Sequence, residues 1–207
     1  MRTGIYSYPN TQRVIFGTPF EQALSKELET VGAQRVYVLS SGSLYRDTEV
    51  VNQLRTVLGS RCVGLFHEMP AHTPRIAVVK AAQEAQQAQA DLILTLGGGS
   101  MTDAGKMLTL CMSNGIESAQ DLDRLATIVH ADGKIERPEF LPPTVPCSVI
   151  STTLSAGEFS ALAGCTDTVR GMKENFLHAK ASPRSVILDP ALTLHTPEWL
   201  WLSTGIR

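Results

Sequence analysis

The chain has 207 residues, 43% hydrophobic and 18% charged, so it can bury a core and is not expected to be disordered. Its formal net charge of −2, without a basic stripe, gives no reason to expect a nucleic-acid partner. No apolar run approaches the roughly 20 residues that cross a bilayer, and the first residues lack the apolar core of a signal peptide. We therefore expect a cytoplasmic globular protein without a nucleic-acid or membrane partner.

Strand-like and helix-like segments alternate along the first half of the chain. Short apolar, β-branched runs predict strands, while apolar residues spaced three or four apart predict helices. The predicted strands are 13–17, 35–41, 62–69 and 91–96. The predicted helices are 18–32, 49–59, a helix after a turn within 70–90, and about 100–113. This alternation is typical of a parallel sheet with helices on both faces, so we predict an α/β fold.

Two strand ends, LSSGS at 39–43 and LGGGS at 96–100, are the expected ligand positions, because ligands bind outside the carboxyl ends of parallel strands. Three glycines expose backbone N–H groups at the second, and the next helix begins near Ser100 with unpaired N–H groups that favour an anion. A phosphate or pyrophosphate suits this loop, although a tight strand-to-helix turn explains the glycines equally well. The loop is neither G-x-G-x-x-G nor a Walker loop.

A second group of small residues, TTLSAGE at 152–158, offers hydroxyl donors and acceptors without bulk. Such a run suits a nucleotide ribose, phosphate or amide, and the alternative is a serine-rich turn. The four cysteines form no CxxC pair, so we expect buried free thiols rather than disulfides or a zinc site. The more polar segment 121–139 contains an ADGK turn, and we expect an edge hairpin or excursion beside the cleft.

Several motifs, in the right order, resemble those of the iron-containing (group III) alcohol dehydrogenase family. GGGSMTDAGK at 97–106 resembles its GGGSxxDxxK signature, ISTTLSAGEFSA at 150–161 resembles IPTTxGTGSExT, and the segment from VILDPAL onward resembles its DPxL passage. The serine-rich loop is one residue shorter than the common form and matches the length of TTxAGSE in maleylacetate reductases. Ala156 and Gly157 stand where those reductases have Gly and Ser. The chain therefore resembles the maleylacetate reductase-like branch.

The resemblance implies an oxidoreductase that transfers a hydride between NAD or NADP and a small alcohol, aldehyde or keto-acid substrate. The chain would be its Rossmann-like cofactor-binding part, with the glycine loop against the pyrophosphate and Lys173 against a ribose. For Lys106, a solvated helix face and a role in the site both remain open. The implied cofactor-binding residues are Ser41, Gly97, Gly98, Gly99, Ser100, Asp103, Thr152, Thr153, Ser155 and Lys173.

Ser41 bears on the choice of cofactor. Many NAD-preferring family members have an Asp at this position, whose carboxylate accepts hydrogen bonds from ribose hydroxyls but repels a 2′-phosphate. A serine removes that repulsion. We therefore expect relaxed or NADP-tolerant binding.

The resemblance also implies two domains: an NAD(P)-binding α/β domain over 1–190 and, over 191–207, the start of an all-helical domain that we expect to be missing. The family's iron or zinc ligands would lie in that domain. The five histidines lack metal-ligand spacing. We expect no metal site and no catalytic residue in this chain. An apolar patch of Trp199, Leu200, Trp201 and Leu202 would then be exposed and favour homo-oligomers.

Two other functions remain open. A lyase similar to dehydroquinate synthase uses NAD on a similar scaffold, and a non-catalytic nucleotide-binding module would need no metal ligands. A net change in NADH during turnover of an alcohol or keto acid would exclude the lyase.

Overall fold

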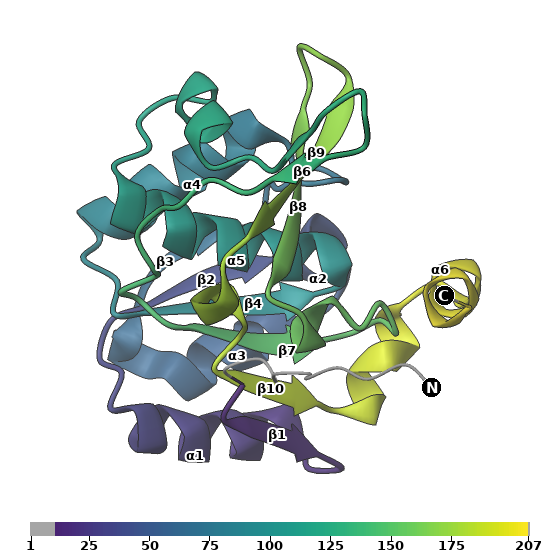
Figure 1. Ribbon diagram of the computed structural model, residues 1–207. Helices are drawn as coiled ribbons and strands as arrows, with labels where there is room; N and C mark the ends of the chain where they lie inside the picture. Colours follow the sequence, from purple (N-terminus) through teal and green to yellow (C-terminus); the bar gives the residue numbers. More distant parts are fainter. Residues whose placement is uncertain (1–10, 207) are drawn as a thin grey trace, which may run out of the picture.

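A sheet of six parallel strands forms the centre of the computed structural model, which describes residues 11–206 (Figure 1). The spatial order of the strands is β1-β10-β7-β4-β2-β3. Their bounds are β1 Arg13–Phe16, β2 Val36–Ser40, β3 Cys62–Phe66, β4 Leu92–Gly97, β7 Cys147–Ser151 and β10 Ser185–Leu188. The predicted α/β fold class, with a parallel sheet, is confirmed.

Helices pack on both faces of the sheet and divide the core into two clusters (Figure 1). α4 (Arg75–Gln87) and α5 (Gly99–Asn114) cover one face, and α1 (Phe20–Val31) and α3 (Val50–Leu58) cover the other. Alternate residues of β4 point to opposite faces: Ile93 belongs to the first cluster, and Leu92 and Leu94 to the second. A strand buried on both faces is a nearly continuous apolar run, and β4 is one apart from the buried Thr95, so the sequence reveals it clearly.

The remaining elements are short. α2 (Gly42–Asp47) and α6 (Glu198–Gly205) are brief helices, and two antiparallel hairpins stand outside the main sheet. The hairpins are β5 (Ile128–Val129) with β6 (Ile135–Glu136), and β8 (Leu162–Asp167) with β9 (Met172–Leu177). The first confirms the hairpin expected within 121–139. The 3₁₀ helices are η1 Gly59–Arg61, η2 Gln120–Arg124, η3 Gly157–Phe159, η4 Ala179–Ala181 and η5 Pro190–His195.

The strand order creates a crevice between β2 and β4. From β2 the chain passes through α3 to β3 on one side, and then returns through α4 to β4 on the other side of β2. Where the connections that follow two neighbouring strands run in opposite directions, a gap opens at the carboxyl ends of these strands. α/β proteins bind ligands in this gap. Ser41 follows β2 at this point, and Gly97 ends β4.

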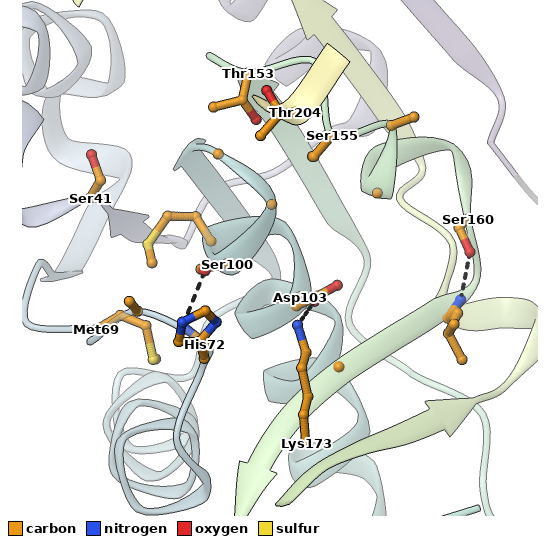
Figure 2. A pocket seen from close by; sticks show the side chains of 18 of the residues that line it. Ser41, Met69, His72, Ser100, Asp103, Thr153, Ser155, Ser160, Lys173 and Thr204 are labelled. Atoms are coloured by element: carbon orange, nitrogen blue, oxygen red, sulfur yellow. Dashed lines mark hydrogen bonds and ion pairs between the residues drawn. The ribbon is translucent and has the colours of Figure 1, made fainter. Parts of the chain in front are cut away.

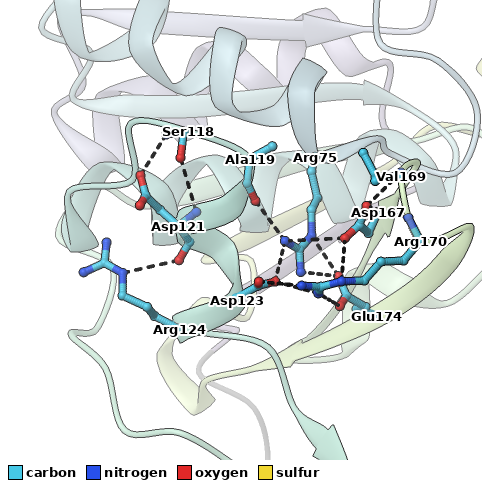
Figure 3. Close-up of polar contacts among 10 residues, drawn as sticks. All are labelled: Arg75, Ser118, Ala119, Asp121, Asp123, Arg124, Asp167, Val169, Arg170 and Glu174. Atoms are coloured by element: carbon cyan, nitrogen blue, oxygen red, sulfur yellow. Dashed lines mark hydrogen bonds and ion pairs between the residues drawn. The ribbon is translucent and has the colours of Figure 1, made fainter.

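A network of charged side chains fastens the β8–β9 hairpin to the body of the domain (Figure 3). Arg75, at the start of α4, is buried and pairs with Asp123 of η2 and Glu174 of β9. Arg170, in the hairpin turn, pairs with Asp123 and with Asp167 of β8. The three carboxylates lie close enough to share a cation. Since both guanidinium groups already pair with them, the cluster is an ion-pair network that holds the hairpin.

This network predicts a specific pH dependence of stability. Hydrogen bonds from Arg170 and Arg75 lower the pKa of the Asp123 carboxyl from 3.8 to about 2. Between those values the unfolded chain binds more protons, so this stabilisation is complete above about pH 4 and is lost as the pH falls toward 2. We expect Asp123→Asn to lower the free energy of unfolding at neutral pH, with a difference from wild type that shrinks in acid. Urea denaturation across the pH range would measure it.

Asp47→Asn changes an exposed carboxylate outside the network and serves as the control. It should leave stability almost unchanged at every pH. A destabilisation by Asp123→Asn that stayed constant from neutral pH to acid would contradict the assignment of the shift to the two arginines.

The structure also shows how far the cysteines and the apolar residues of α6 are exposed to solvent. Cys62, Cys111, Cys147 and Cys165 are free thiols, and all but Cys62 are buried. On α6, Trp199 and Leu202 are exposed, whereas Leu200 and Trp201 are partly covered. Self-association through this face stays a prediction. Among residues 11–206 no helix has the length and apolarity needed to span a membrane.

Candidate functional site

A cleft of about 670 Å³ opens at the carboxyl ends of β2 and β4 (Figure 2). The glycine loop, the serine-rich loop, the segment after β3, the β8–β9 hairpin and α6 form its walls. Every predicted cofactor-binding residue except Gly97 and Thr152 lines it. No residue of the β5–β6 hairpin does, so that hairpin forms no wall of the cleft.

A side chain on any of the three glycines would meet close neighbours in the cleft. Gly97 has a φ of +149°, a conformation that favours glycine. A Cβ on Gly98 would lie 2.8 Å from Thr153 Cγ2, and one on Gly99 would lie 3.0 Å from Ser155 Oγ. The Gly98 carbonyl accepts the first hydrogen bonds of α5, which Met101 N and Thr102 N donate. The backbone N–H groups that precede Met101 therefore have no acceptor within the helix. This bare backbone and the positive end of α5 suit an anion.

Two hydroxyls face the glycine loop without a partner. Thr153 is only 7% exposed, and neither its Oγ1 nor Ser155 Oγ has a hydrogen-bond partner in the structure. Buried polar atoms are normally paired, because an orphaned donor costs about 1–3 kcal/mol. A Cβ on Gly98 would lie 3.1 Å from Thr153 Oγ1. The two hydroxyls and the glycine loop therefore form a cradle that fits the phosphate groups of a dinucleotide.

Lys106 is fully buried beneath the cleft. Its ammonium donates hydrogen bonds to the backbone carbonyls of Gly157, Ser160 and Leu162, at the start of the β8–β9 hairpin. Burial lowers the pKa of Lys106, and the Asp103 carboxylate, whose Oδ1 lies 3.5 Å from Nζ, opposes the shift. The interpretation of Lys106 as part of a solvated helix face is therefore wrong. The side chain instead ties the serine-rich loop to α5.

Asp103 lies between two lysines at the floor of the cleft. Its Oδ2 is 3.6 Å from the ammonium of Lys173, which comes from β9 (Figure 2). Gly164, two residues before the register partner of Lys173 on β8, makes this possible, since a Cβ there would overlap Lys173 Cε. The Lys173 side chain remains 49% exposed, so its ammonium is available at the cleft.

A strained turn forms the wall opposite the serine-rich loop. His72 and Thr73 both have left-handed backbone conformations, with φ of 65° and 56°. Ser100 holds the turn: its Oγ accepts a hydrogen bond from His72 N at 3.3 Å, and its carbonyl accepts one from Thr73 Oγ1 at 3.0 Å. Such strain costs of order 1–3 kcal/mol per residue and concentrates at functional sites. The sequence predicts only a turn at the start of 70–90, whereas the structure places His72 of that turn in the cleft wall.

Gly97 and Thr152 do not line the cleft but connect its two loops by a hydrogen bond. Thr152 N donates a hydrogen bond to Gly97 O at 3.0 Å, and Thr152 O accepts one from Thr196 Oγ1 at 2.7 Å. The second bond attaches the segment before α6 to the serine-rich loop. Thr204 of α6 reinforces it, because its Oγ1 accepts a hydrogen bond from Leu154 N.

Ser41 lies at the other end of the cleft. Its Oγ accepts a hydrogen bond from Leu44 N at 3.4 Å and so caps α2. The Ser43 hydroxyl is 3.4 Å from it. This end of the cleft therefore presents neutral hydroxyls after β2.

Ala156 occupies a left-handed conformation, with φ 56° and ψ 10°, where maleylacetate reductases have Gly. This costs a residue with a Cβ about 1–2 kcal/mol. After allowing for the greater freedom of glycine when unfolded, we expect Ala156→Gly to raise the free energy of unfolding by about 0.5–1 kcal/mol. Ala191→Gly, at a position without positive φ, should lower it by a similar amount. Chemical denaturation would compare them, and destabilisation by Ala156→Gly would disprove the strain.

The described lining of the cleft does not offer a set of metal ligands. His72 and Asp103 are its imidazole and carboxylate groups, and Asp103 is already paired with two lysines. Iron, which the family name implies, does not fit the side chains that this part of the chain presents. No step of the chemistry is therefore assigned to a metal here.

Comparisons with known proteins agree with this geometry. The family model for iron-containing alcohol dehydrogenase matches residues 11–190. The chain is 34% identical over 199 residues to dehydrogenase FUM7 of Gibberella moniliformis, covering 94% of this chain and 46% of that protein. It is 31% identical over 195 residues to maleylacetate reductase of Burkholderia cepacia, covering 94% of this chain and 45% of that protein.

The crystal structure of maleylacetate reductase from Agrobacterium tumefaciens superposes with a TM-score of 0.72 and 26% identity, covering 99% of this chain and 48% of that one. The chain thus spans about half the length of the curated relatives that it matches. It belongs to the iron-containing alcohol dehydrogenase family, as its motifs suggested.

Proposed function

We propose that this member of the iron-containing alcohol dehydrogenase family is the dinucleotide-binding part of an NAD(P)-dependent oxidoreductase. The observation that carries the proposal is the bare glycine loop faced by the unpartnered hydroxyls of Thr153 and Ser155. A bound nicotinamide cofactor supplies or accepts a hydride at a carbonyl or alcohol carbon. The names of the maleylacetate reductases favour a keto-acid substrate over a simple alcohol.

Each wall of the cleft would have a distinct task. The N–H groups at the start of α5 and the hydroxyls of Thr153 and Ser155 would hold the pyrophosphate. Lys173, oriented by Asp103, would bind a ribose of the cofactor, and Ser41 would face the adenosine end. These residues bind and orient, and none is assigned the proton transfer. The division at residue 190 and the cytoplasmic location stay predictions.

Calorimetric titration of the chain with NADH tests the proposal. We expect saturable binding to one site, in competition with ADP-ribose, because the cradle recognises the shared pyrophosphate. Absence of saturable binding by either NADH or NADPH would refute it. The lyase alternative predicts no net NADH consumption, so oxidation of NADH by a keto acid in the whole protein would exclude that alternative.

Cofactor preference gives a separate prediction. Because Ser41 is neutral, we expect NADPH to bind within a hundredfold of NADH, and Ser41→Asp to weaken NADPH about tenfold or more relative to NADH. Aspartate also caps helices, so α2 should persist. Ser41→Asn keeps the cap without the charge and is the control. A wild-type chain that bound NADH more than about a hundredfold better than NADPH would contradict this expectation.

A further inference from the structure

We infer that Arg46, which lies beside the cleft and not among its lining residues, recognises the 2′-phosphate of NADP and so determines cofactor specificity. The inference rests on the proposed function, since it takes the cleft to hold a nicotinamide dinucleotide. It adds a residue to which neither the glycine signature nor the serine-rich loop points.

The position of the Arg46 guanidinium is the first observation. A Cβ on Gly42 would lie 2.6 Å from Arg46 Nη1 and 3.1 Å from the carbonyl oxygen of His67. The guanidinium therefore lies over the bare backbone of Gly42, one residue after Ser41. His67 directly follows β3, so the charge is held at the carboxyl ends of β2 and β3. The adenosine ribose of a dinucleotide lies beside the corresponding strand end in Rossmann-type folds.

The surroundings of Arg46 are the second observation. Tyr45 and His67 stack with ring centroids 3.6 Å apart, which fixes α2 against the end of β3. Arg46 itself is exposed, and its guanidinium takes part in none of the ion pairs or hydrogen bonds among residues 11–206. This contrasts with Arg75 and Arg13, which pair with carboxylates. The five donors of Arg46 remain available to a ligand.

The chemistry of this corner matches a phosphate monoester. A guanidinium binds phosphate through paired hydrogen bonds, and hydroxyls add neutral donors beside it. Ser41 and Ser43 supply two such hydroxyls, 3.4 Å apart. A carboxylate at position 41 would neutralise the guanidinium, and the serine leaves its charge free. The corner therefore recognises the group that distinguishes NADP from NAD.

Titrations with NADPH, NADH, 2′,5′-ADP and 5′-ADP test this inference. Arg46→Gln should weaken NADPH and 2′,5′-ADP by about tenfold to a hundredfold while changing NADH and 5′-ADP by about twofold or less. Arg55→Gln removes an exposed, unpaired charge near the amino end of β3, away from the cleft, and should change none of them. Thermal melting should show that both variants remain folded.

Two results would overturn the inference. One is equal weakening of NADPH and NADH by Arg46→Gln, which would indicate a structural role for Arg46. The other is unchanged affinity for all four ligands. If the wild-type chain bound neither NADH nor NADPH, the proposed function itself would fail, and the inference with it. Binding of NADH without an effect of Arg46 on NADPH would overturn the inference alone.

Discussion

Gly98→Val should abolish dinucleotide binding while leaving the domain folded. The backbone of Gly98 has an ordinary φ of −88°, so valine is not excluded by backbone strain. Its side chain would instead occupy the space in front of Thr153, where the first Cβ already falls 2.8 Å from Cγ2. If the pyrophosphate loses two charge-assisted hydrogen bonds to the glycine loop and its facing hydroxyls, each of about 1.5–3 kcal/mol, the affinity for NADH should fall about a hundredfold or more. Calorimetry would measure the affinity, and circular dichroism would measure folding.

A paired variant separates the two ways in which Gly98 can act. Gly98→Ala also meets Thr153 Cγ2, and adding Thr153→Ser removes that methyl group but keeps the hydroxyl. If Gly98 leaves space for the ligand, binding should stay weak in the double variant. Full recovery of NADH affinity would show that the glycine is needed only for packing against Thr153, and would remove the pyrophosphate from this position.

Lys106→Met should cause the largest loss of stability. The substitution keeps most of the apolar side chain but deprives the carbonyls of Gly157, Ser160 and Leu162 of their donor. It also leaves Asp103 with a single, half-exposed partner. Breaking a buried charged contact in this way costs about 3–5 kcal/mol. Urea denaturation of the variant and the wild type would measure the difference in the free energy of unfolding.

Lys173→Met is the matched control, because both lysines flank the same carboxylate. Lys173 is half exposed, so its replacement should change stability by about 1 kcal/mol or less, yet it should weaken NADH binding. The two lysines would then divide the tasks of holding the cleft together and contacting the ligand. A Lys106→Met variant as stable as wild type would show that the buried ammonium contributes nothing net.

The sequence revealed strands that contain long apolar runs, and failed at two strands whose polar residues pair with each other inside the core. β2 and β4 are mostly apolar runs, and the predicted strands at 35–41 and 91–96 cover all of β2 and all of β4 except Gly97. β7 and β10 contain serines and were not predicted as strands. In the structure the hydroxyls of Ser148 and Ser185 bond to each other at 2.8 Å across the two strands. Each polar group satisfies the other inside the core, a pairing that neither segment shows alone.

The sequence indicated some residues of the candidate site and gave no sign of others. The glycine loop could be recognised because three successive glycines after an apolar strand are typical of bare backbone, which suits a bound anion or a tight turn. Lys106 could not be placed, because its acceptors lie 51 to 56 residues later and meet it only in the folded chain. The strained turn at His72 was also missed. Its left-handed conformations depend on hydrogen bonds that the turn donates to Ser100 and on one that it accepts from Thr166, not on local turn residues.

The position of β1 in the sheet has a consequence for biosynthesis. β1 pairs only with β10, so that Arg13 lies beside Ser185 and Phe16 beside Leu188. A ribosome releases β1 well before β10, so the nascent chain carries β1 without its partner strand until β10 has been synthesised. The strands that form the cleft emerge earlier and can assemble before the sheet is complete. Chaperones should therefore protect β1 until β10 arrives, and folding should finish at that edge.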